Sequence, residues 1–402
     1  MATYAFDKIS EGEEILTIRF KRFYTFTLAK DRLLTLGSYH IKDNALVFPD
    51  LSEKAFWNKF RFVLQEGMST LTSNLTGKKV IYLDEDLGVP LLGTNEFGII
   101  DRGSNIIEIK PNTGCNLNCT FCSVSEGINK KDYDYLVDPD FLLRELEPVV
   151  ALKKHPVEIN IGPQGEPLLY PDLVSLIKGL KEIANIATIS MNSNGVLLTK
   201  QLIDELAHAG LDRINLSLHT LDETLAKKIM GNKAYSVTHL VEQINYCKGK
   251  IAVLFAPVMI KGVNEELKDV VELSKEFSSP FPKMGIQNYL HYKGGRIIAK
   301  EMQWDDFFNR IKALENETGE QLMLKTDANP FHIFPEQTLP KPFLKGEVIT
   351  ADIKMPGRFS RDKIAVAKDR AITIRNCPQE KGSIKIKLIR DKHNIFSGVP
   401  LR

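Results

Sequence analysis

"GCNLNCTFCSV", residues 114–124, places three cysteines within eight positions of a chain that has 5 cysteines among its 402 residues. Cys115, Cys119 and Cys122 are spaced as C-x3-C-x2-C. If positions are treated as independent, this pattern arises by chance in roughly one such chain in a thousand. The spacing therefore indicates that the three thiolates ligate one group together.

A 4Fe–4S cluster suits three cysteines better than zinc does. Structural zinc usually takes four protein ligands, and no histidine lies between residues 114 and 135 to complete such a set. Three thiolates can hold three irons of a cluster, whose fourth iron then stays open to an external ligand. An open iron predicts chemistry at this position.

Several features indicate a cytoplasmic protein without a membrane partner. Three clustered cysteines differ from the even, dispersed framework of a secreted disulfide protein. The first residues lack the apolar segment of a signal peptide. The longest apolar candidate, residues 251–260, is too short to span a bilayer and contains Pro257.

Outward from the cysteines, residues 105–326 alternate short apolar runs with helical stretches, which is the pattern of βαβ units. Six runs are candidate strands: 105–111, 157–163, 187–193, 213–219, 251–258 and 284–291. Six strands with five crossovers predict an α/β fold built on a partial (β/α)6 barrel.

The chain is predicted to have four parts. Residues 1–95 mix alternating and amphipathic stretches and are expected to form a small α+β domain. The partial barrel takes residues 100–326. Residues 327–352 contain several prolines and form a linker, whereas residues 353–402 contain closely spaced short strands typical of a small β-barrel.

The cysteine spacing, with Phe121 before the last cysteine and a strand leading in, resembles the signature of radical S-adenosylmethionine (SAM) enzymes. Residues 161–171, IGPQGEPLLYP, resemble the strand end that holds the amino group of SAM in that superfamily. Residues 189–195, 214–220 and 257–266 resemble its later strand ends, which contact the ribose, carboxylate and adenine. The similarity covers residues 105–292.

The resemblance implies a set of roles for this chain. Cys115, Cys119 and Cys122 would ligate a 4Fe–4S cluster, and one electron from an external donor would cleave SAM to a 5′-deoxyadenosyl radical. We expect an apolar strand interior that keeps water from the radical. The implied SAM contacts are Phe121, Gly165, Glu166, Ser190, Asn192, Asn194, Ser217, Val258 and Asn264.

The C-terminal segment predicts an anionic partner. Residues 341–402 hold 15 Lys and Arg against 6 Asp and Glu, a net charge of +9 in a chain whose net charge is +2. Residues 355–400 resemble a TRAM domain, an OB-like barrel that carries RNA to modification enzymes. OB-type barrels bind nucleic acid with a basic groove and stacking aromatics. The expected RNA contacts are Arg358, Phe359, Arg361, Lys363, Lys368, Arg370, Lys385, Lys387, Arg390, Lys392 and Phe396.

Together these features predict a radical SAM enzyme that modifies RNA, with tRNA favoured. Methylthiolation of RNA is disfavoured, because RNA methylthiotransferases also use a second, N-terminal cluster ligated by cysteines. No cysteine precedes Cys115 in this sequence. Adenosine methylation needs two further reactive cysteines, and we expect Cys247 and Cys377 to be a buried helix residue and a turn residue. No D-x-H-x-x-G cobalamin pattern occurs. A peptide or protein substrate, and a non-catalytic iron–sulfur RNA-binding protein, remain alternatives.

Overall fold

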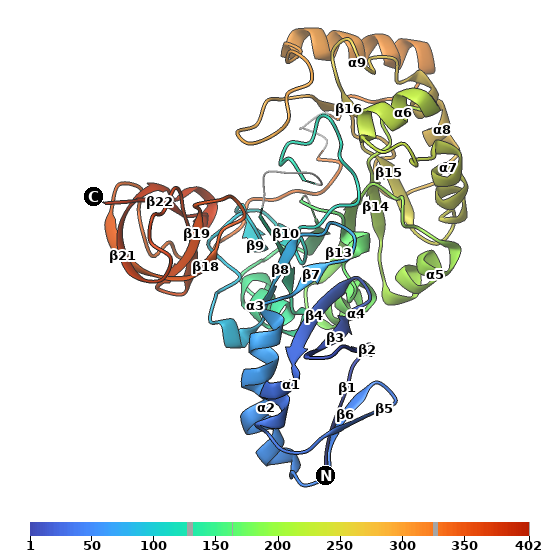
Figure 1. Ribbon diagram of the computed structural model, residues 1–402. Coiled ribbons are helices and arrows are strands. Elements are labelled where there is room, and N and C mark those ends of the chain that lie inside the picture. Colours follow the sequence, from blue (N-terminus) through green and yellow to red (C-terminus); the bar gives the residue numbers. More distant parts are fainter. Residues whose placement is uncertain (127–131, 163, 325–328, 402) are drawn as a thin grey trace.

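The computed structural model describes residues 1–126, 132–162, 164–324 and 329–401. An N-terminal α+β unit, a central α/β core and a C-terminal β-barrel follow one another along the chain (Figure 1). The α/β fold class with its small C-terminal barrel is confirmed. No helix within the described ranges is long and apolar enough to cross a membrane.

A six-stranded sheet forms the core, in the order β15-β14-β13-β12-β10-β9. Five of its strands are parallel, and β9 joins one edge antiparallel to β10. The strands are β9 (Gly98–Asp101), β10 (Ile106–Lys110), β12 (Val157–Ile161), β13 (Ile186–Ser193), β14 (Arg213–Leu216) and β15 (Ala252–Phe255). Their carboxyl ends therefore meet at one edge, where α/β sites are built.

The sixth predicted strand is much shorter than the sequence suggested. Within residues 284–291, only β17 (Gln287–Asn288) is a strand, and it pairs with β16 (Val258–Met259) in a separate two-stranded sheet. Pro257 lies between β15 and β16 and has no N–H to donate to a ladder, so the sheet is interrupted there. The chain still follows the sheet edge, because Gly285 donates its N–H to the Phe255 carbonyl at 2.8 Å.

Amphipathic helices connect the parallel strands and bury their apolar sides against the core. At the starts of α3 and α6, aspartate side chains cap the free N–H groups. Asp138 accepts from the Phe141 N–H at 2.9 Å, and Asp222 accepts from the Leu225 N–H at 2.7 Å. The helices of this part are α3 (Pro139–Val150), α4 (Leu173–Glu182), α5 (Lys200–Ala209), α6 (Glu223–Met230), α7 (Val237–Tyr246), α8 (Lys268–Lys275) and α9 (Trp304–Thr318).

Two sheets make up the N-terminal unit, in the orders β1-β6-β5 and β11-β8-β7-β4-β3-β2. The elements are β1 (Ala2–Ala5), β2 (Lys8–Glu11), β3 (Ile15–Phe20), β4 (Tyr24–Ala29), α1 (Lys30–Leu34), β5 (His40–Lys42), β6 (Ala45–Phe48), α2 (Glu53–Met68), β7 (Thr72–Ser73) and β8 (Lys79–Leu83). Strand β11 (Tyr133–Val137) follows the cysteine stretch and pairs parallel with β8. The sequence did not predict β11, which joins the N-terminal sheet to the core.

The C-terminal strands close into a barrel in the order β18-β19-β20-β22-β21. They are β18 (Val348–Pro356), β19 (Lys363–Ala367), β20 (Arg370–Ile374), β21 (Gly382–Arg390) and β22 (Ser397–Pro400). The first strand thus begins five residues before the expected start at 353, and the expected limit at 326–327 lies outside the described residues.

Backbone hydrogen bonds attach this barrel to the segment that precedes β9. The Ala371 N–H donates to the Leu92 carbonyl at 2.8 Å, and the Phe396 N–H donates to the Gly93 carbonyl at 2.7 Å. Gly93 has φ +114, and a Cβ there would lie 2.3 Å from the Ala371 carbonyl oxygen. The two surfaces are therefore in direct backbone contact.

Candidate functional site

The three clustered cysteines lie in the loop after β10, at the carboxyl edge of the core sheet, and each is partly buried. Burial, and then the negative charge of the Cys122 thiolate, raise the pKa of Cys119 to about 12. Burial, the Glu166 carboxylate and the other two thiolates also raise the pKa of Cys115. The thiols of Cys115 and Cys119 therefore lie near the Cys122 sulfur, and a cationic group beside them would favour their ionised forms.

Three separate segments of the core fix the backbone of this loop. Against the end of α6, the Asn118 N–H donates to the Met230 carbonyl at 3.2 Å. On the side of β12, the Glu166 N–H donates to the Gly114 carbonyl at 2.8 Å. The Arg296 N–H, from the loop after β17, donates to the Cys122 carbonyl at 3.0 Å.

Glu166 is the acidic residue of the turn after β12 and is almost completely buried. Its carboxylate accepts from the Ser193 hydroxyl at 2.7 Å, the Asn194 N–H at 2.8 Å and the Leu168 N–H at 3.1 Å. Burial raises the pKa of Glu166 to about 7, although these three hydrogen bonds act in the opposite direction. A cation beside it would favour the ionised form, which suits the ammonium group of an amino acid.

The end of β13 is also tied to the cysteine stretch. The Asn194 side-chain amide donates to Asn116 Oδ1 at 2.9 Å, and Asn194 Oδ1 accepts from the Val196 N–H at 3.0 Å. On the neighbouring strand end, the Ser217 N–H donates to the Ser193 carbonyl at 2.9 Å. The predicted polar strand ends therefore lie side by side next to the cysteines.

His219 lies at the same edge and was not among the predicted site residues. Its ring packs edge-on against Phe121, with 4.6 Å between the ring centroids. Its Nδ1 accepts from the Val258 N–H at 3.0 Å, so Nε2 carries the ring proton. Among the described residues, buried Nε2 has no hydrogen-bond partner. The unused donor beside Phe121 is the kind of group that a polar ligand would satisfy.

Comparison with known proteins decides the family. A sequence profile of the radical SAM superfamily matches residues 109–274, which contain the end of β10, the cysteine stretch and strands β12 to β15. An uncharacterized protein of Methanocaldococcus jannaschii is 36% identical over 357 residues, and the match covers 82% of each chain. The chain belongs to the radical SAM superfamily. Its cofactors are accordingly a 4Fe–4S cluster and SAM.

Other radical SAM proteins are similar over a smaller part. A GTP 3′,8-cyclase of Clostridium botulinum (strain Hall) is 30% identical over 178 residues, which cover 44% of this chain and 54% of that protein. The chain thus spans about half the length of that cyclase. A solved structure of TYW1 with a lysine–pyruvate adduct bound is 20% identical and covers 58% of this chain and 80% of that one, with a TM-score of 0.42.

The radical SAM site fits its two cofactors through the three neighbouring thiols, the buried carboxylate of Glu166 and the unused donor of His219. Cys115, Cys119 and Cys122 would hold the cluster. No three His, Cys, Asp or Glu side chains of the described residues meet the geometry of a single-ion site. The structure brings together most of the predicted SAM contacts: Phe121, Gly165, Glu166, Asn194, Ser217 and Val258.

Two predicted SAM contacts are corrected by the structure. Ser190 is completely buried, and its hydroxyl bonds to Glu158 at 2.6 Å and to Asn160 at 2.8 Å, below the strand ends. Asn264 uses both amide hydrogens on the carbonyls of His219 and Val258, each at 2.9 Å. Asn264 therefore fixes the position of neighbouring residues and has no amide hydrogen left for adenine.

The expected apolar strand interior is wrong. On the face of the sheet opposite the apolar residues, polar side chains of three adjacent strands form one network. Arg213 pairs with Glu158 at 2.5 Å, and Asn192 Oδ1 accepts from the Asn215 amide at 2.7 Å. Asn192, predicted to contact SAM, is thus part of this network. Because strand side chains alternate between faces, runs such as VEINI carry a polar face as well as an apolar one.

Three predicted RNA contacts are also corrected. Arg358 is 1% exposed, Lys363 is 6% exposed and Phe396 is completely buried. Lys363 pairs with Glu380 at 2.6 Å, and Phe396 packs against Phe343 inside the barrel. These residues stabilise the protein and are not available to a ligand on its surface.

The burial of His219 predicts a pH dependence of stability. Burial lowers its pKa to about 3, whereas an unfolded histidine titrates near about 6.5. The folded state therefore binds fewer protons, and the free energy of unfolding should fall as the pH drops below about 6.5, by up to about 1.4 kcal/mol per pH unit.

Urea unfolding of the cluster-free chain and of its His219→Gln variant at pH 7.5 and 5.0 measures this effect. The wild-type chain should lose about 2 kcal/mol more than the variant between the two values. Equal losses would contradict the burial of a neutral imidazole.

Proposed function

We propose that this radical SAM enzyme modifies RNA, with tRNA as the favoured substrate, and that the C-terminal barrel is a TRAM-like RNA-binding domain. The closed, basic barrel attached to the catalytic core carries the proposal. Six of the predicted RNA contacts are exposed, and Phe359 and Arg370 are partly exposed. The exposed residues are Arg361, Lys368, Lys385, Lys387, Arg390 and Lys392.

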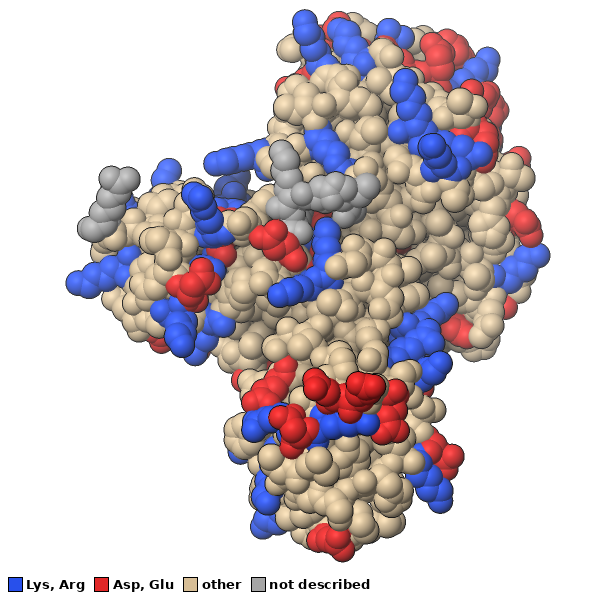
Figure 2. All heavy atoms as spheres, viewed as in Figure 1, with Lys and Arg blue, Asp and Glu red and all other residues tan. Residues whose placement is uncertain are grey.

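Charge on the barrel surface suits a phosphate backbone. Lys and Arg side chains project from the barrel at the left of Figure 2, with acidic side chains between some of them. On β21, Lys385 and Lys387 are exposed while Ile386 and Leu388 point into the barrel core. Such alternation leaves the basic side chains free to contact phosphates from one face of a strand.

The polar interior of the core supports a polar substrate such as a nucleoside. Asn192 and Asn215 are partly exposed, and their amides offer donors and acceptors of the kind that read base edges. Arg213 Nη1 is buried without a partner among the described residues. An apolar substrate would leave these groups unsatisfied, which costs free energy.

In the proposed reaction the residues at the strand ends position SAM. When bound, the cluster and SAM supply a 5′-deoxyadenosyl radical, with the electron coming from an external donor. Glu166, fixed by three hydrogen bonds, would hold the ammonium group of SAM. Phe121 and Val258 would line the adenine beside His219.

RNA affinity should depend on the exposed barrel residues. Replacing Lys385, Lys387, Arg390 and Lys392 by glutamine removes up to four cations that could neutralise phosphates. The slope of log affinity for tRNA against log salt should become shallower by up to about 0.9 for each phosphate that is no longer neutralised, measured by filter binding between 50 and 200 mM salt. A matched control replaces Lys42, Lys54, Lys59 and Arg61, which are exposed on the N-terminal unit. Equal slopes for both variants would contradict RNA docking on the barrel.

A free purine nucleotide is the second candidate substrate, favoured by the similarity to GTP 3′,8-cyclases. If RNA is the substrate, the reconstituted enzyme should form 5′-deoxyadenosine when it is given SAM, reductant and unmodified tRNA. The tRNA of a strain lacking the gene should then lack one modified nucleoside, which mass spectrometry measures. That nucleoside would also define the methyl or other carbon group transferred. Turnover with GTP alone would favour the second candidate, and turnover with neither would favour a peptide or protein substrate.

A further inference from the structure

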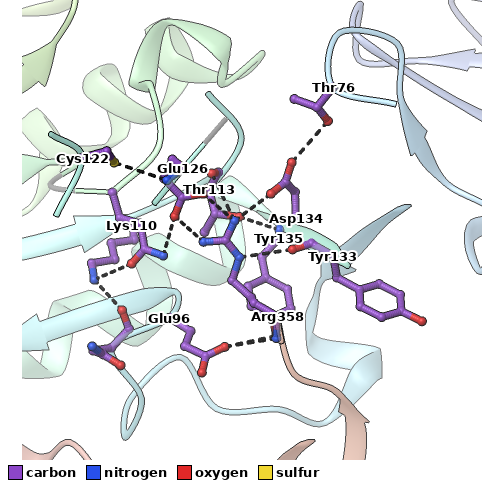
Figure 3. A network of polar contacts seen from close by, with 12 residues as sticks. Thr76, Glu96, Lys110, Thr113, Cys122, Glu126, Tyr133, Asp134, Tyr135 and Arg358 are labelled. Carbon is purple, nitrogen blue, oxygen red and sulfur yellow. Dashed lines mark hydrogen bonds and ion pairs between the residues drawn. The ribbon is translucent and has the colours of Figure 1, made fainter. Parts of the chain in front are cut away.

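Arg358 comes from the C-terminal barrel but lies inside the core, beside the cysteine loop (Figure 3). It follows β18, and its guanidinium holds Glu126 through two hydrogen bonds, at 2.5 Å from Nη1 and 2.8 Å from Nη2. Nη2 also bonds to Asp134 at 2.7 Å, and Nε donates to the Tyr133 carbonyl at 3.1 Å. One arginine thus connects the barrel to Glu126, shortly after the last cysteine, and to Asp134 in β11.

Glu126 leads from this arginine to the last cysteine of the motif. Its backbone N–H donates to Cys122 Sγ at 3.2 Å. Its carboxylate also accepts from the Gln164 amide at 2.9 Å, and Lys110 in turn donates to Gln164 Oε1 at 3.1 Å. The Glu126 carbonyl accepts from Arg296 Nη2 at 2.5 Å. The residue whose N–H is directed at a cysteine sulfur is thus also the residue whose carboxylate Arg358 holds in a fork.

The chemistry and the burial of the Arg358–Glu126 pair both indicate that it does more than stabilise the fold. The side chains of Arg358 and Glu126 are 1% and 4% exposed, and burying two charges costs free energy that a well-packed apolar pair would not. Only arginine offers parallel N–H groups that fix a carboxylate in two dimensions. Hydrogen bonds to the sulfur atoms of an iron–sulfur cluster favour its more negative, reduced form and so raise its reduction potential.

We propose that Arg358 is a positioning residue for the cluster: by fixing Glu126, it keeps the Glu126 N–H directed at Cys122 Sγ and sets the reduction potential of the cluster. The inference rests on the assignment of Cys122 as a cluster ligand. It gives the C-terminal barrel a second role in addition to RNA docking. It requires no particular substrate, so it can fail or hold independently of RNA modification.

The test compares Arg358→Gln and Arg358→Lys in the full, anaerobically reconstituted chain without RNA. The midpoint potential and the EPR spectrum of the reduced cluster are measured by redox titration. Both variants should shift the potential downward and change the EPR line shape, with the larger shift in Arg358→Gln. Lysine keeps the charge but cannot hold both carboxylate oxygens, so its shift reports positioning.

A matched control is the pair Arg32→Gln and Arg32→Lys, because Arg32 forms the same fork with Glu66 at 2.8 Å on the exposed surface of the N-terminal unit. These variants should leave both readouts unchanged. If Arg358→Gln takes up no cluster, Arg358→Lys decides. A wild-type potential and spectrum in Arg358→Lys would overturn the proposal, because charge alone would then explain any effect of glutamine.

Discussion

Replacing Cys119 by alanine is expected to lower the formation of 5′-deoxyadenosine at least about 100-fold, because two thiolates cannot retain a complete cuboid cluster. Iron and sulfide content after anaerobic reconstitution should fall in parallel, and the EPR signal of the reduced cluster should disappear. The loop itself should stay attached to the core, since its bonds to α6 and to the turn after β12 use backbone groups. Circular dichroism should therefore remain close to that of the wild-type chain.

Cys247→Ala is the matched control for this loss. Cys247 is completely buried after α7, and its thiol approaches the Gln243 carbonyl at 3.7 Å. It packs as a small apolar residue remote from the cysteine loop in sequence, so its removal should cost about 1 kcal/mol of stability and leave the iron content unchanged. Full cluster occupancy in Cys119→Ala, or its loss in Cys247→Ala, would show that the wrong thiols had been assigned.

The sequence predicted the parts of the fold whose signals are local. Each of β10, β12, β13, β14 and β15 lies in one of the short apolar runs that alternate with helical stretches, and the core sheet contains all five. The alternating Lys and Ile of β21 likewise predicted a barrel strand. Strand β11 could not be predicted as part of the N-terminal sheet, because its pairing with β8 depends on residues more than 50 positions earlier.

The same distinction applies to the site. Cysteine spacing and the turn containing Glu166 are short motifs, and they could be found without a structure. Arg358 was predicted to face RNA because its sequence neighbours are basic, whereas its partners Glu126 and Asp134 lie more than 220 residues away. His219 carried a signal within its own motif, since a histidine ends an apolar strand there, but its unused Nε2 depends on how Val258 and Phe121 pack around it.

The second large effect is expected at Gly165, where the turn after β12 meets the cysteine loop. Gly165 has φ +77, and a Cβ there would lie 2.8 Å from the Gly114 carbonyl oxygen and 2.8 Å from the Thr113 carbonyl carbon. Both contacts are with backbone, which cannot rotate away as a side chain would. Alanine at this position should therefore push the cysteine loop from its place and also weaken the bond from the Glu166 N–H to Gly114.

Gly249→Ala is the control that distinguishes backbone strain from the steric clash expected in Gly165→Ala. It has φ +75, nearly the same as Gly165, but nothing lies within 4 Å of an added Cβ. Gly249→Ala should cost only the left-handed conformation, about 1–2 kcal/mol, and leave iron content unchanged. Gly165→Ala should cost at least about 1 kcal/mol more in urea unfolding, because it adds a steric clash to the same strain, and should lower iron content several-fold. Equal stability losses and equal iron contents in Gly165→Ala and Gly249→Ala would mean that the turn and the cysteine loop are not in contact. The placement of Glu166 beside the cluster would then also be wrong.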